Sequence, residues 1–451
     1  MADVVIKNAE FLITTARSPK ISRGATLVVS DGRIEDVAHR DSSGRIPGAD
    51  AVIDGRKKVV LPGLVNAHVH VEETLGMNMI SDTVRHIPWF ERWILPYYES
   101  LTESDAYYSA LLSQVLMLRG GITCYADSAS RYPESSARAA SESGIRAFLA
   151  RWTCDTGKYL PSPIEECVRE TDRLLRRYSS GRIMALASVI GLNQCSDELY
   201  LAIKQLAEDR GVVVTSHESS GHEDVERCLK RKGLRPVENL AKIGFLSPRT
   251  LLSHLTDVSK REVALLARSG TKVSLCPSAE LKKGKGLFHY GKLPLMIRAG
   301  VKFSLGTDTA NSSNHLNVLK AANLLLLLAK DHAMDPRILD AGRVLDMATG
   351  EGAHCLGLDD DKEGRYGRIE EGSIADIAIF NLDDMEWFSM NQDPVQWLLY
   401  GDNPRAYSTI VDGKVAYLDG RFALPKINLV LEQCKRRSER IRSDVISSRK
   451  A

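Results

Sequence analysis

The central part of the chain alternates between short apolar runs and longer segments in which apolar and polar residues recur at helical spacing. Eight apolar runs have the length of strands. They are Leu61–Val65, Ile122–Ala126, Ala147–Ala150, Ile183–Ile190, Val212–Thr215, Thr250–Ser253, Lys272–Leu275 and Val301–Leu305. Strands that alternate with helices over residues 61–350 are typical of parallel sheets.

Glycines mark the ends of the predicted helices. The segment Leu101–Arg119 opens with Thr102 and Asp105, spaced as in a capping box, and ends before Gly120. Three more segments stop directly before a glycine: Ser196–Arg210, Ser259–Ser269 and Leu293–Ala299. Eight repeats of strand and helix predict an α/β fold of the (β/α)₈, TIM-like barrel type. A doubly wound sheet is the alternative, but no G-x-G-x-x-G motif follows the first strand.

Both ends of the chain carry short strand patterns broken by turn residues. Asp54-Gly55 interrupts the early strands, and a tight Asp412-Gly413 turn separates two late ones. We expect one small β-sandwich domain formed from both chain ends, residues 1–60 and 365–425, around a barrel at residues 61–364. Residues 426–451 form a basic segment with interspersed acids, which predicts a solvated C-terminal helical tail.

Composition excludes several classes of partner. The 451 residues carry a formal net charge of +2, so no basic field indicates nucleic acid or an anionic membrane. The longest apolar run, Leu324–Ala329, is too short to cross a bilayer, and the first residues lack the pattern of a secretory signal. The eight cysteines are scattered without a C-x-x-C pair, which favours a reducing, cytoplasmic location.

Five residues that can carry chemistry stand at predicted strand ends. His68 and His70 follow the first strand, His217 the fifth, His254 the sixth and Asp308 the eighth. In a barrel these ends open onto one face, and the two histidines of a His-x-His strand point the same way. Each histidine alone is equally typical of a buried structural residue. Together they predict a divalent metal site, for which imidazoles and one carboxylate suit zinc or a similar transition metal.

Several segments together resemble the amidohydrolase superfamily. They are Pro62–His70, Cys276–Lys282, Leu305–Asp308, Asn311–Asn314, Ala348–Ala353 and Gly367–Asp376. The resemblance covers nearly the whole chain and is greatest to the branch of cytosine and adenosine deaminases and triazine chlorohydrolases. It implies that His68, His70, His217 and Asp308 bind the metal, that Asp308 also accepts a proton from the bound water, and that His254 polarises the group under attack. Two-metal members of this superfamily use a lysine at the end of the fourth strand. Residues 183–191 contain no lysine, so the resemblance implies a single metal, zinc first and iron second.

One position departs from the family pattern. Members of this branch usually carry a proton-shuttling glutamate three residues after the fifth-strand histidine, where this chain has Ser220. Glu73, Glu218 and His222 are candidate substitutes, although a supporting or surface role fits each equally well. Ser220 can instead bind substrate through a hydrogen bond.

The segment that follows the first strand, residues 72–99, is long for a βα loop and rich in aromatic residues. Trp89 and Trp93 predict a lid or pocket wall for a flat substrate, or a helix face that packs inward. Arg85 and His86 are more typical of surface residues.

These features predict a metal-dependent hydrolase that acts on a C–N bond. The leading hypothesis is hydrolytic deamination of an aromatic nitrogen heterocycle, a small molecule, through metal-bound hydroxide. Dechlorination, or hydrolysis of an amine, amide or cyclic amide, on the same site is the alternative. A structural homologue without catalysis is the non-enzyme alternative. The resemblance also implies a homo-oligomer, most simply a dimer.

Overall fold

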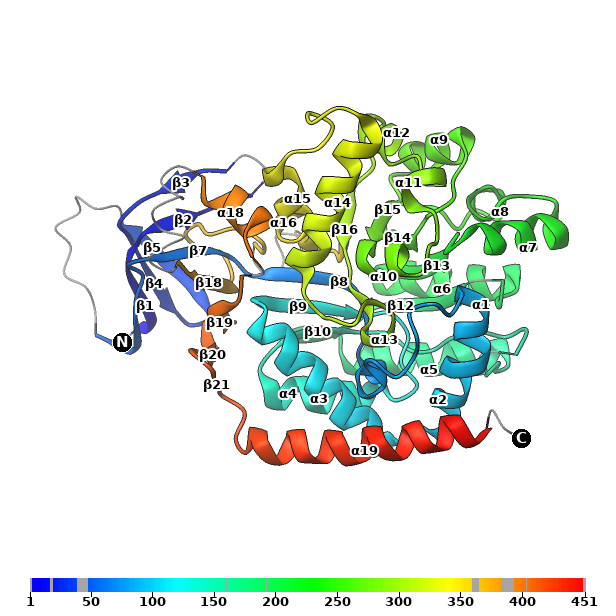
Figure 1. Cartoon of the computed structure of the whole chain (residues 1–451), viewed down its shortest axis with the longest axis horizontal. Helices are drawn as coiled ribbons and strands as arrows, with labels where there is room; N and C mark the ends of the chain where they lie inside the picture. Colours follow the sequence, from blue (N-terminus) through cyan, green and yellow to red (C-terminus); the bar gives the residue numbers. More distant parts are fainter. Residues whose placement is uncertain are drawn as a thin grey trace.

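The computed structural model describes residues 2–16, 19–38, 48–158, 160–191, 193–358, 365–382, 393–402 and 404–448. Its centre holds two five-stranded sheets with parallel pairing throughout (Figure 1). Their orders are β11-β10-β9-β8-β17 and β12-β13-β14-β15-β16. The strands are β8 (Leu64–His70), β9 (Ile122–Asp127), β10 (Arg146–Leu149), β11 (Ile183–Ala185), β12 (Ala187–Gly191), β13 (Val214–Glu218), β14 (Thr250–His254), β15 (Lys272–Leu275), β16 (Phe303–Leu305) and β17 (Asp308–Thr309). The predicted α/β class is therefore confirmed.

At both edges the two sheets are connected by only one or two residues of chain. Only Leu186 separates β11 from β12, and its N–H donates a hydrogen bond to β10. Gly306 and Thr307 separate β16 from β17, and their N–H groups donate to β15 and β8 respectively. The run at residues 183–190, predicted as one strand, is thus divided between the two sheets.

Helices follow the strands and cover the outside of the sheets (Figure 1). α3 (Glu103–Arg119) begins at the predicted capping box, in which Thr102 and Asp105 satisfy each other's backbone N–H groups. Serine caps begin α6 (Asp197–Arg210) and α9 (Lys260–Ser269), and a glycine in the left-handed conformation ends each of them. The helix boundaries that the glycine pattern predicted therefore agree with the structure.

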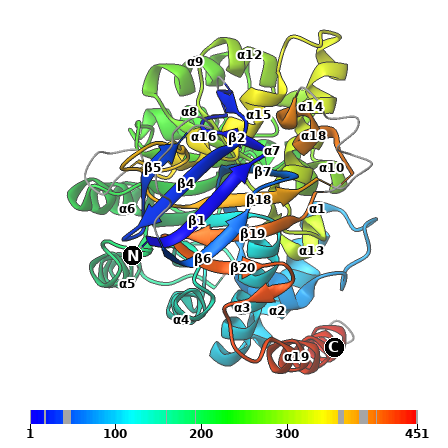
Figure 2. The same ribbon diagram turned by 90° about the vertical axis from the view of Figure 1, so that its left-hand side faces the viewer.

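Strands from both chain ends form two further sheets, ordered β5-β4-β1-β6 and β21-β20-β19-β18-β7-β2-β3. The smaller comprises β1 (Ala2–Ala9), β4 (Ala25–Ser30), β5 (Arg33–Ala38) and β6 (Ala49–Asp54). The larger comprises β2 (Phe11–Ile13), β3 (Ile21–Ser22), β7 (Lys58–Pro62), β18 (Ile377–Asn381), β19 (Ala406–Val411), β20 (Lys414–Leu418) and β21 (Arg421–Phe422). In Figure 2 the smaller sheet lies in front of the larger. One hydrophobic cluster joins them, with Ile6 and Leu27 from the first and Val60 and Ile377 from the second.

The C-terminal helix α19 (Ile427–Ser448) lies along α2 (Leu95–Ser100) and α3, at the lower edge of Figure 1. Cys434, Ile441 and Val445 are buried against the rest of the chain. Arg437 and Arg440 both pair with the buried Asp105 of α3. The expectation of a solvated tail is therefore wrong for one face of this helix, because its basic residues contact a partner that lies far away in the sequence.

None of the helices among the described residues combines the length and the apolar character needed to cross a membrane. All eight cysteines are buried free thiols. The domain boundary expected at residue 364 and the last three residues of the chain fall outside the described residues.

Candidate active site

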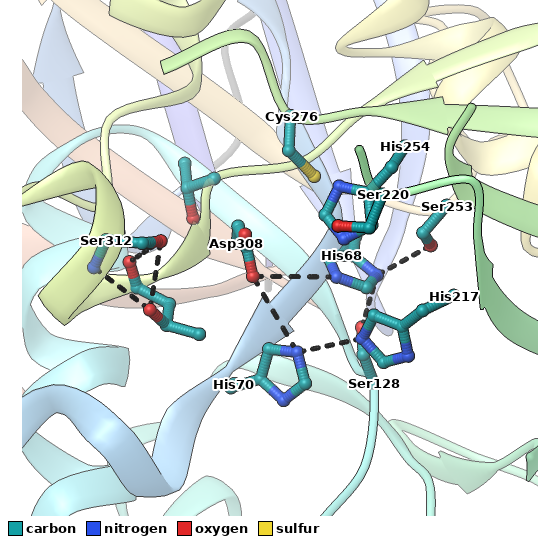
Figure 3. Close-up of polar contacts among 12 residues, drawn as sticks. His68, His70, Ser128, His217, Ser220, Ser253, His254, Cys276, Asp308 and Ser312 are labelled. Atoms are coloured by element: carbon teal, nitrogen blue, oxygen red, sulfur yellow. Dashed lines mark hydrogen bonds and ion pairs between the residues drawn. The ribbon is translucent and has the colours of Figure 1, made fainter. Parts of the chain in front are cut away.

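Four of the five strand-end residues turn toward one point at the carboxyl ends of the parallel strands (Figure 3). Nε2 of His70 lies 3.0 Å from Nε2 of His217. Oδ1 of Asp308 lies 3.7 Å from Nε2 of His70 and 3.8 Å from Nε2 of His68. His254 is adjacent, with a ligand-type atom within 4.8 Å of those of His68 and Asp308. The structure thus brings together all five residues that the sequence placed at strand ends.

Hydrogen bonds on the far side of the His68 and His217 rings leave Nε2 of each ring facing this point. Nδ1 of His217 donates to the carbonyl oxygen of Ile190 at 3.0 Å, so its Nε2 carries the lone pair. Nδ1 of His68 contacts the hydroxyl groups of Ser128 and Ser253, each at 2.7 Å. Within the described part of the chain, Nε2 of the buried His68 has no hydrogen-bond partner. A buried ring nitrogen aimed at other acceptor atoms suits a cation between them.

Burial sets the charge of the site. It lowers the pKa of His70 to about 4 and the pKa of His217 well below its usual range, so both rings are neutral near neutral pH. Burial alone would raise the pKa of Asp308, but contacts with His68 and the positive charge of Lys285 hold this pKa well below its usual range. Neutral imidazoles and an ionised carboxylate are the protonation states that a divalent metal requires.

Two of these residues hold unusual backbone conformations. His254 has φ of 77° and Asp308 has φ of 57°, in the left-handed region that residues other than glycine rarely occupy. Each such conformation costs on the order of 1–2 kcal/mol and persists only where the surrounding structure fixes it. Strain of this kind clusters at functional sites.

A narrow pocket of about 30 Å³ opens beside the histidines. The segment after β8 covers it with α1 (His86–Trp89) and the π-helical turn Phe90–Ile94. Its lining comprises His70, Glu73, His86, Trp89, Phe90, Trp152, Ile190, His217, Ser220, His254, Lys285, Asp308 and Thr309. This volume holds a water molecule or two rather than a ring, so a flat ligand requires the covering segment to move outward.

Of the five residues predicted to contact substrate, three line the pocket and two do not. Glu73, Ser220 and Trp89 line the pocket. Trp93 packs half-buried against the hydrophobic core instead. Glu218 points away from the site and accepts hydrogen bonds from Tyr200 and Ser216.

Glu73 is held firmly in the pocket wall. Its carboxylate accepts hydrogen bonds from Tyr98 at 2.9 Å and from Asn311 at 2.5 Å. Burial nevertheless raises the pKa of Glu73 to about 8, so it holds a proton near neutral pH. His222, the remaining substitute considered, bonds to Asp257 at 2.6 Å and is half-exposed outside the pocket lining.

Sequence reasoning missed six pocket residues, of which His86, Trp152 and Lys285 bear most on the chemistry. His86, expected at the surface, lines the pocket with its side chain only 14% exposed and its ring stacked on Trp89. Trp152 follows β10, and Lys285 lies between two short helices beyond β15. A glycine-flanked lysine such as Lys285 has no sequence signal that distinguishes it from the less buried Lys282 and Lys283.

The chain belongs to the amidohydrolase family, whose model matches residues 59–416. It is thus a metal-dependent hydrolase of C–N bonds, as the motifs predicted. It is 30% identical over 422 residues to a 5-methylthioadenosine/S-adenosylhomocysteine deaminase of Caldicellulosiruptor saccharolyticus, covering 93% of this chain and 94% of that protein. It is 32% identical over 415 residues to a 5'-deoxyadenosine deaminase of Methanothermobacter thermautotrophicus, covering 91% and 93%.

Two solved structures show a similar fold. An adenosine deaminase from Xanthomonas campestris with bound zinc has a TM-score of 0.91 and 23% identity, covering 98% of this chain and 99% of that one. An atrazine chlorohydrolase from Arthrobacter aurescens complexed with zinc has a TM-score of 0.86 and 24% identity, covering 96% and 100%. At these identities the likeness concerns the fold.

Proposed function

We propose that His68, His70, His217 and Asp308 hold one divalent metal, zinc first and iron second. Two nitrogens on one tetrahedral zinc, each about 2.0–2.1 Å from the ion, lie about 3.3 Å apart. The 3.0 Å between Nε2 of His70 and Nε2 of His217 is close to that separation. The zinc in the similar adenosine deaminase supports the same choice of ion.

We further propose that the parallel strands close into a (β/α)₈ barrel with a sandwich of strands from both chain ends beside it. The sharing of chain segments between the two parallel sheets supports closure. The hydrophobic cluster between the two outer sheets supports the sandwich. In this arrangement the metal site lies at the carboxyl-terminal face, where barrel enzymes carry their active sites.

We propose that the chain deaminates a flat nitrogen heterocycle. This proposal rests on two observations. Three imidazole nitrogens and one carboxylate converge at strand ends, and relatives of the chain are named as deaminases of adenosine derivatives. When bound, the metal supplies the Lewis acidity that makes water a nucleophile near neutral pH.

The chain's own residues manage the protons. Asp308 is ionised and accepts the proton of the attacking water, which it then returns to the departing amino group. His254 is held by Glu280, with Nδ1 and Oε1 3.3 Å apart, and can stabilise charge that develops on the ring. Trp89 and Trp152 offer flat faces against which a heterocycle can stack.

The test is ammonia release from a panel of amino-substituted purines, pyrimidines and triazines by the zinc-loaded protein. Asp308→Asn and His254→Asn should each lower kcat by about 10²–10⁴-fold, because each removes a group that handles charge or protons. Metal analysis should show zinc retained in His254→Asn. The control is His332→Asn on the exposed end of α14 (Val318–Ala333), which should keep full activity. If no compound in the panel released ammonia, the proposed deaminase activity would be refuted.

A second candidate keeps the metal and changes the bond that breaks. Ser220, which accepts a hydrogen bond from Lys285, stands where this branch usually carries its proton-shuttling glutamate, and this favours dechlorination or hydrolysis of a substituted amine or amide. Release of chloride, amine or acid in place of ammonia from the same panel would support this candidate. Carefully purified protein that binds no metal and turns over nothing would instead indicate a homologue without catalysis. The expected dimer stays a prediction, which light scattering would test.

A further inference from the structure

A buried lysine stands in the pocket wall. Lys285 is only 7% exposed and lines the same pocket as His254 and Asp308. Its amine donates a hydrogen bond to Oγ of Ser220 at 2.7 Å. The backbone fixes this placement, because the N–H of Lys285 donates to the carbonyl of Glu280 at 2.9 Å and left-handed glycines, Gly284 and Gly286, flank it.

The partner that the structure gives this ammonium group does not match its charge. An ammonium group has three N–H donors and a full positive charge, whereas Ser220 offers one neutral hydroxyl. Among the described residues Lys285 makes no ion pair within 4.0 Å. A buried charge without a counter-charge is costly, and proteins keep one where a ligand supplies the missing charge or where function requires it.

The carboxyl groups around the pocket form no ion pair with Lys285. Glu73 accepts hydrogen bonds from a tyrosine and an asparagine. Glu280 accepts a backbone N–H and contacts His254, and burial raises the pKa of Glu280 to about 8. Asp308 faces the histidines of the proposed metal site. Asp308 is ionised and partly offsets the charge of Lys285, but none of the three lies within ion-pairing distance of the lysine.

Asp224 of α7 (His222–Lys232) is the alternative counter-charge for Lys285 within the protein, in place of a ligand. Its Oδ2 is buried without a hydrogen bond and lies 3.9 Å from Nε2 of His86. Burial raises the pKa of Asp224 to about 6, although the charge of Lys285 works against that rise. If Asp224 fully compensated the lysine, the pocket would show no preference for a negative ligand, and this difference makes the rival testable.

We propose that Lys285 and Ser220 form a subsite for an anionic oxygen on the substrate. The preferred substrates are then flat, acidic, oxo-substituted heterocycles rather than purely amino-substituted rings. The ammonium and hydroxyl groups both donate to such an oxygen, while an amino group in the same place would direct its own N–H donors at the lysine. This inference rests on the proposed function, since it assumes that a heterocycle reaches the pocket beside the histidines.

The experiment measures binding to the zinc-loaded full chain by calorimetry. The probes are barbiturate, an anion near neutral pH, and 2,4,6-triaminopyrimidine, which has the same ring with amino groups in place of the oxygens. The wild type should bind barbiturate more tightly, and Lys285→Met should weaken barbiturate binding by about 30-fold or more while changing triaminopyrimidine binding little. Lys282→Met is the matched control, because Lys282 lies three residues earlier outside the pocket lining and should leave both affinities unchanged.

A second variant changes the hydrogen-bond partner of Lys285 instead of the lysine itself. Ser220→Glu keeps the lysine and places a carboxylate beside it, so an internal ion pair should replace the ligand and abolish the preference for barbiturate. Circular dichroism and zinc analysis establish that each variant is folded and loaded. Equal affinity of the wild type for both probes, or an unchanged affinity ratio in folded Lys285→Met or Ser220→Glu, would overturn the subsite. Ammonia assayed after each titration shows whether the amino-substituted probe was turned over. A failure to release ammonia would refute the deaminase and leave the binding result readable.

Discussion

At the residue scale, Gly306 lets the chain between β16 and β17 pass directly against His68. A Cβ atom at this position would lie 2.6 Å from Cβ of His68 and 2.9 Å from Sγ of Cys276. Neither contact can relax cheaply, because both neighbours are fully buried and His68 is already held by two serine hydroxyls. The smallest residue is therefore needed for packing against a proposed metal ligand rather than for an unusual φ.

We expect Gly306→Ala to displace His68 and lower both zinc content and stability, with a loss on the order of 1–3 kcal/mol from overpacking. Metal analysis and thermal unfolding of the purified variant measure the two effects. Gly48→Ala is the control, since a Cβ there meets nothing within 4 Å. Full zinc occupancy in Gly306→Ala would show that His68 tolerates the displacement or does not bind the metal.

The sequence predicted the strand-end residues because their chemistry follows from position alone. A His-x-His pair on an extended strand points both rings one way, and His217, His254 and Asp308 each end a predicted strand. Lys285 could not be predicted in this way. It meets Ser220 from 65 residues further along the chain, and only the folded path of the intervening helices brings the two together.

At the element scale, a buried ion pair joins the parallel strands to the outer sheets. Arg146 of β10 is 1% exposed and donates two hydrogen bonds, at 2.9 and 3.1 Å, to the carboxylate of Asp376, which directly precedes β18. Asp376 also accepts the backbone N–H of Asp412 in the tight turn between β19 and β20. The geometry is bidentate, so both charges are compensated without water.

Removing Arg146 leaves Asp376 charged and buried, and removing Asp376 leaves Arg146 only its 3.4 Å contact with the half-exposed Asp412. Arg146→Met and Asp376→Asn should therefore each lower the free energy of unfolding by about 3–5 kcal/mol. The double variant Arg146→Met with Asp376→Asn should lose less than the sum of the single changes, because it leaves no buried uncompensated charge. Urea unfolding of the full chain measures all three. Arg56→Ala, which breaks an exposed pair with Asp54, should change stability by no more than about 0.5 kcal/mol. Additive losses in the double variant would contradict the coupling.

Local signals explain which elements the sequence could predict. Capping residues and terminal glycines act within one turn of chain, so the bounds of α3, α6 and α9 followed from the sequence. The covering segment after β8 was harder to predict, because aromatic residues at helical spacing fit a pocket wall and a packing face equally. Both occur: Trp89 lines the pocket while Trp93 packs against the core.

At the scale of the whole molecule, the last helix supports the first loop of the site. Besides its contacts with α2 and α3, α19 packs on the 3₁₀ turn Val71–Gly76, and Ser438 donates a hydrogen bond to the carbonyl of Leu75. That turn carries Glu73 and leads into the segment that covers the pocket. The sequence could not predict this support, because charge alternation along a helix describes its exposed face and says nothing about which distant element its apolar positions meet.

The two faces of α19 provide the test of this support. Ile441 is fully buried, whereas Ile446 is 36% exposed on the same helix. A carboxylate at position 441 must either be buried without a partner or detach the helix, so Ile441→Asp should lower stability by about 3 kcal/mol or more. Because the covering segment then loses its outer support, KM for a substrate found in the ammonia panel should rise more than kcat falls, and zinc content should stay constant. Ile446→Asp should change none of these quantities. If Ile441→Asp lowered stability but left KM unchanged, α19 would stabilise the fold without holding the pocket cover, and substrate entry would depend on the segment from Val71 to Ser100 alone.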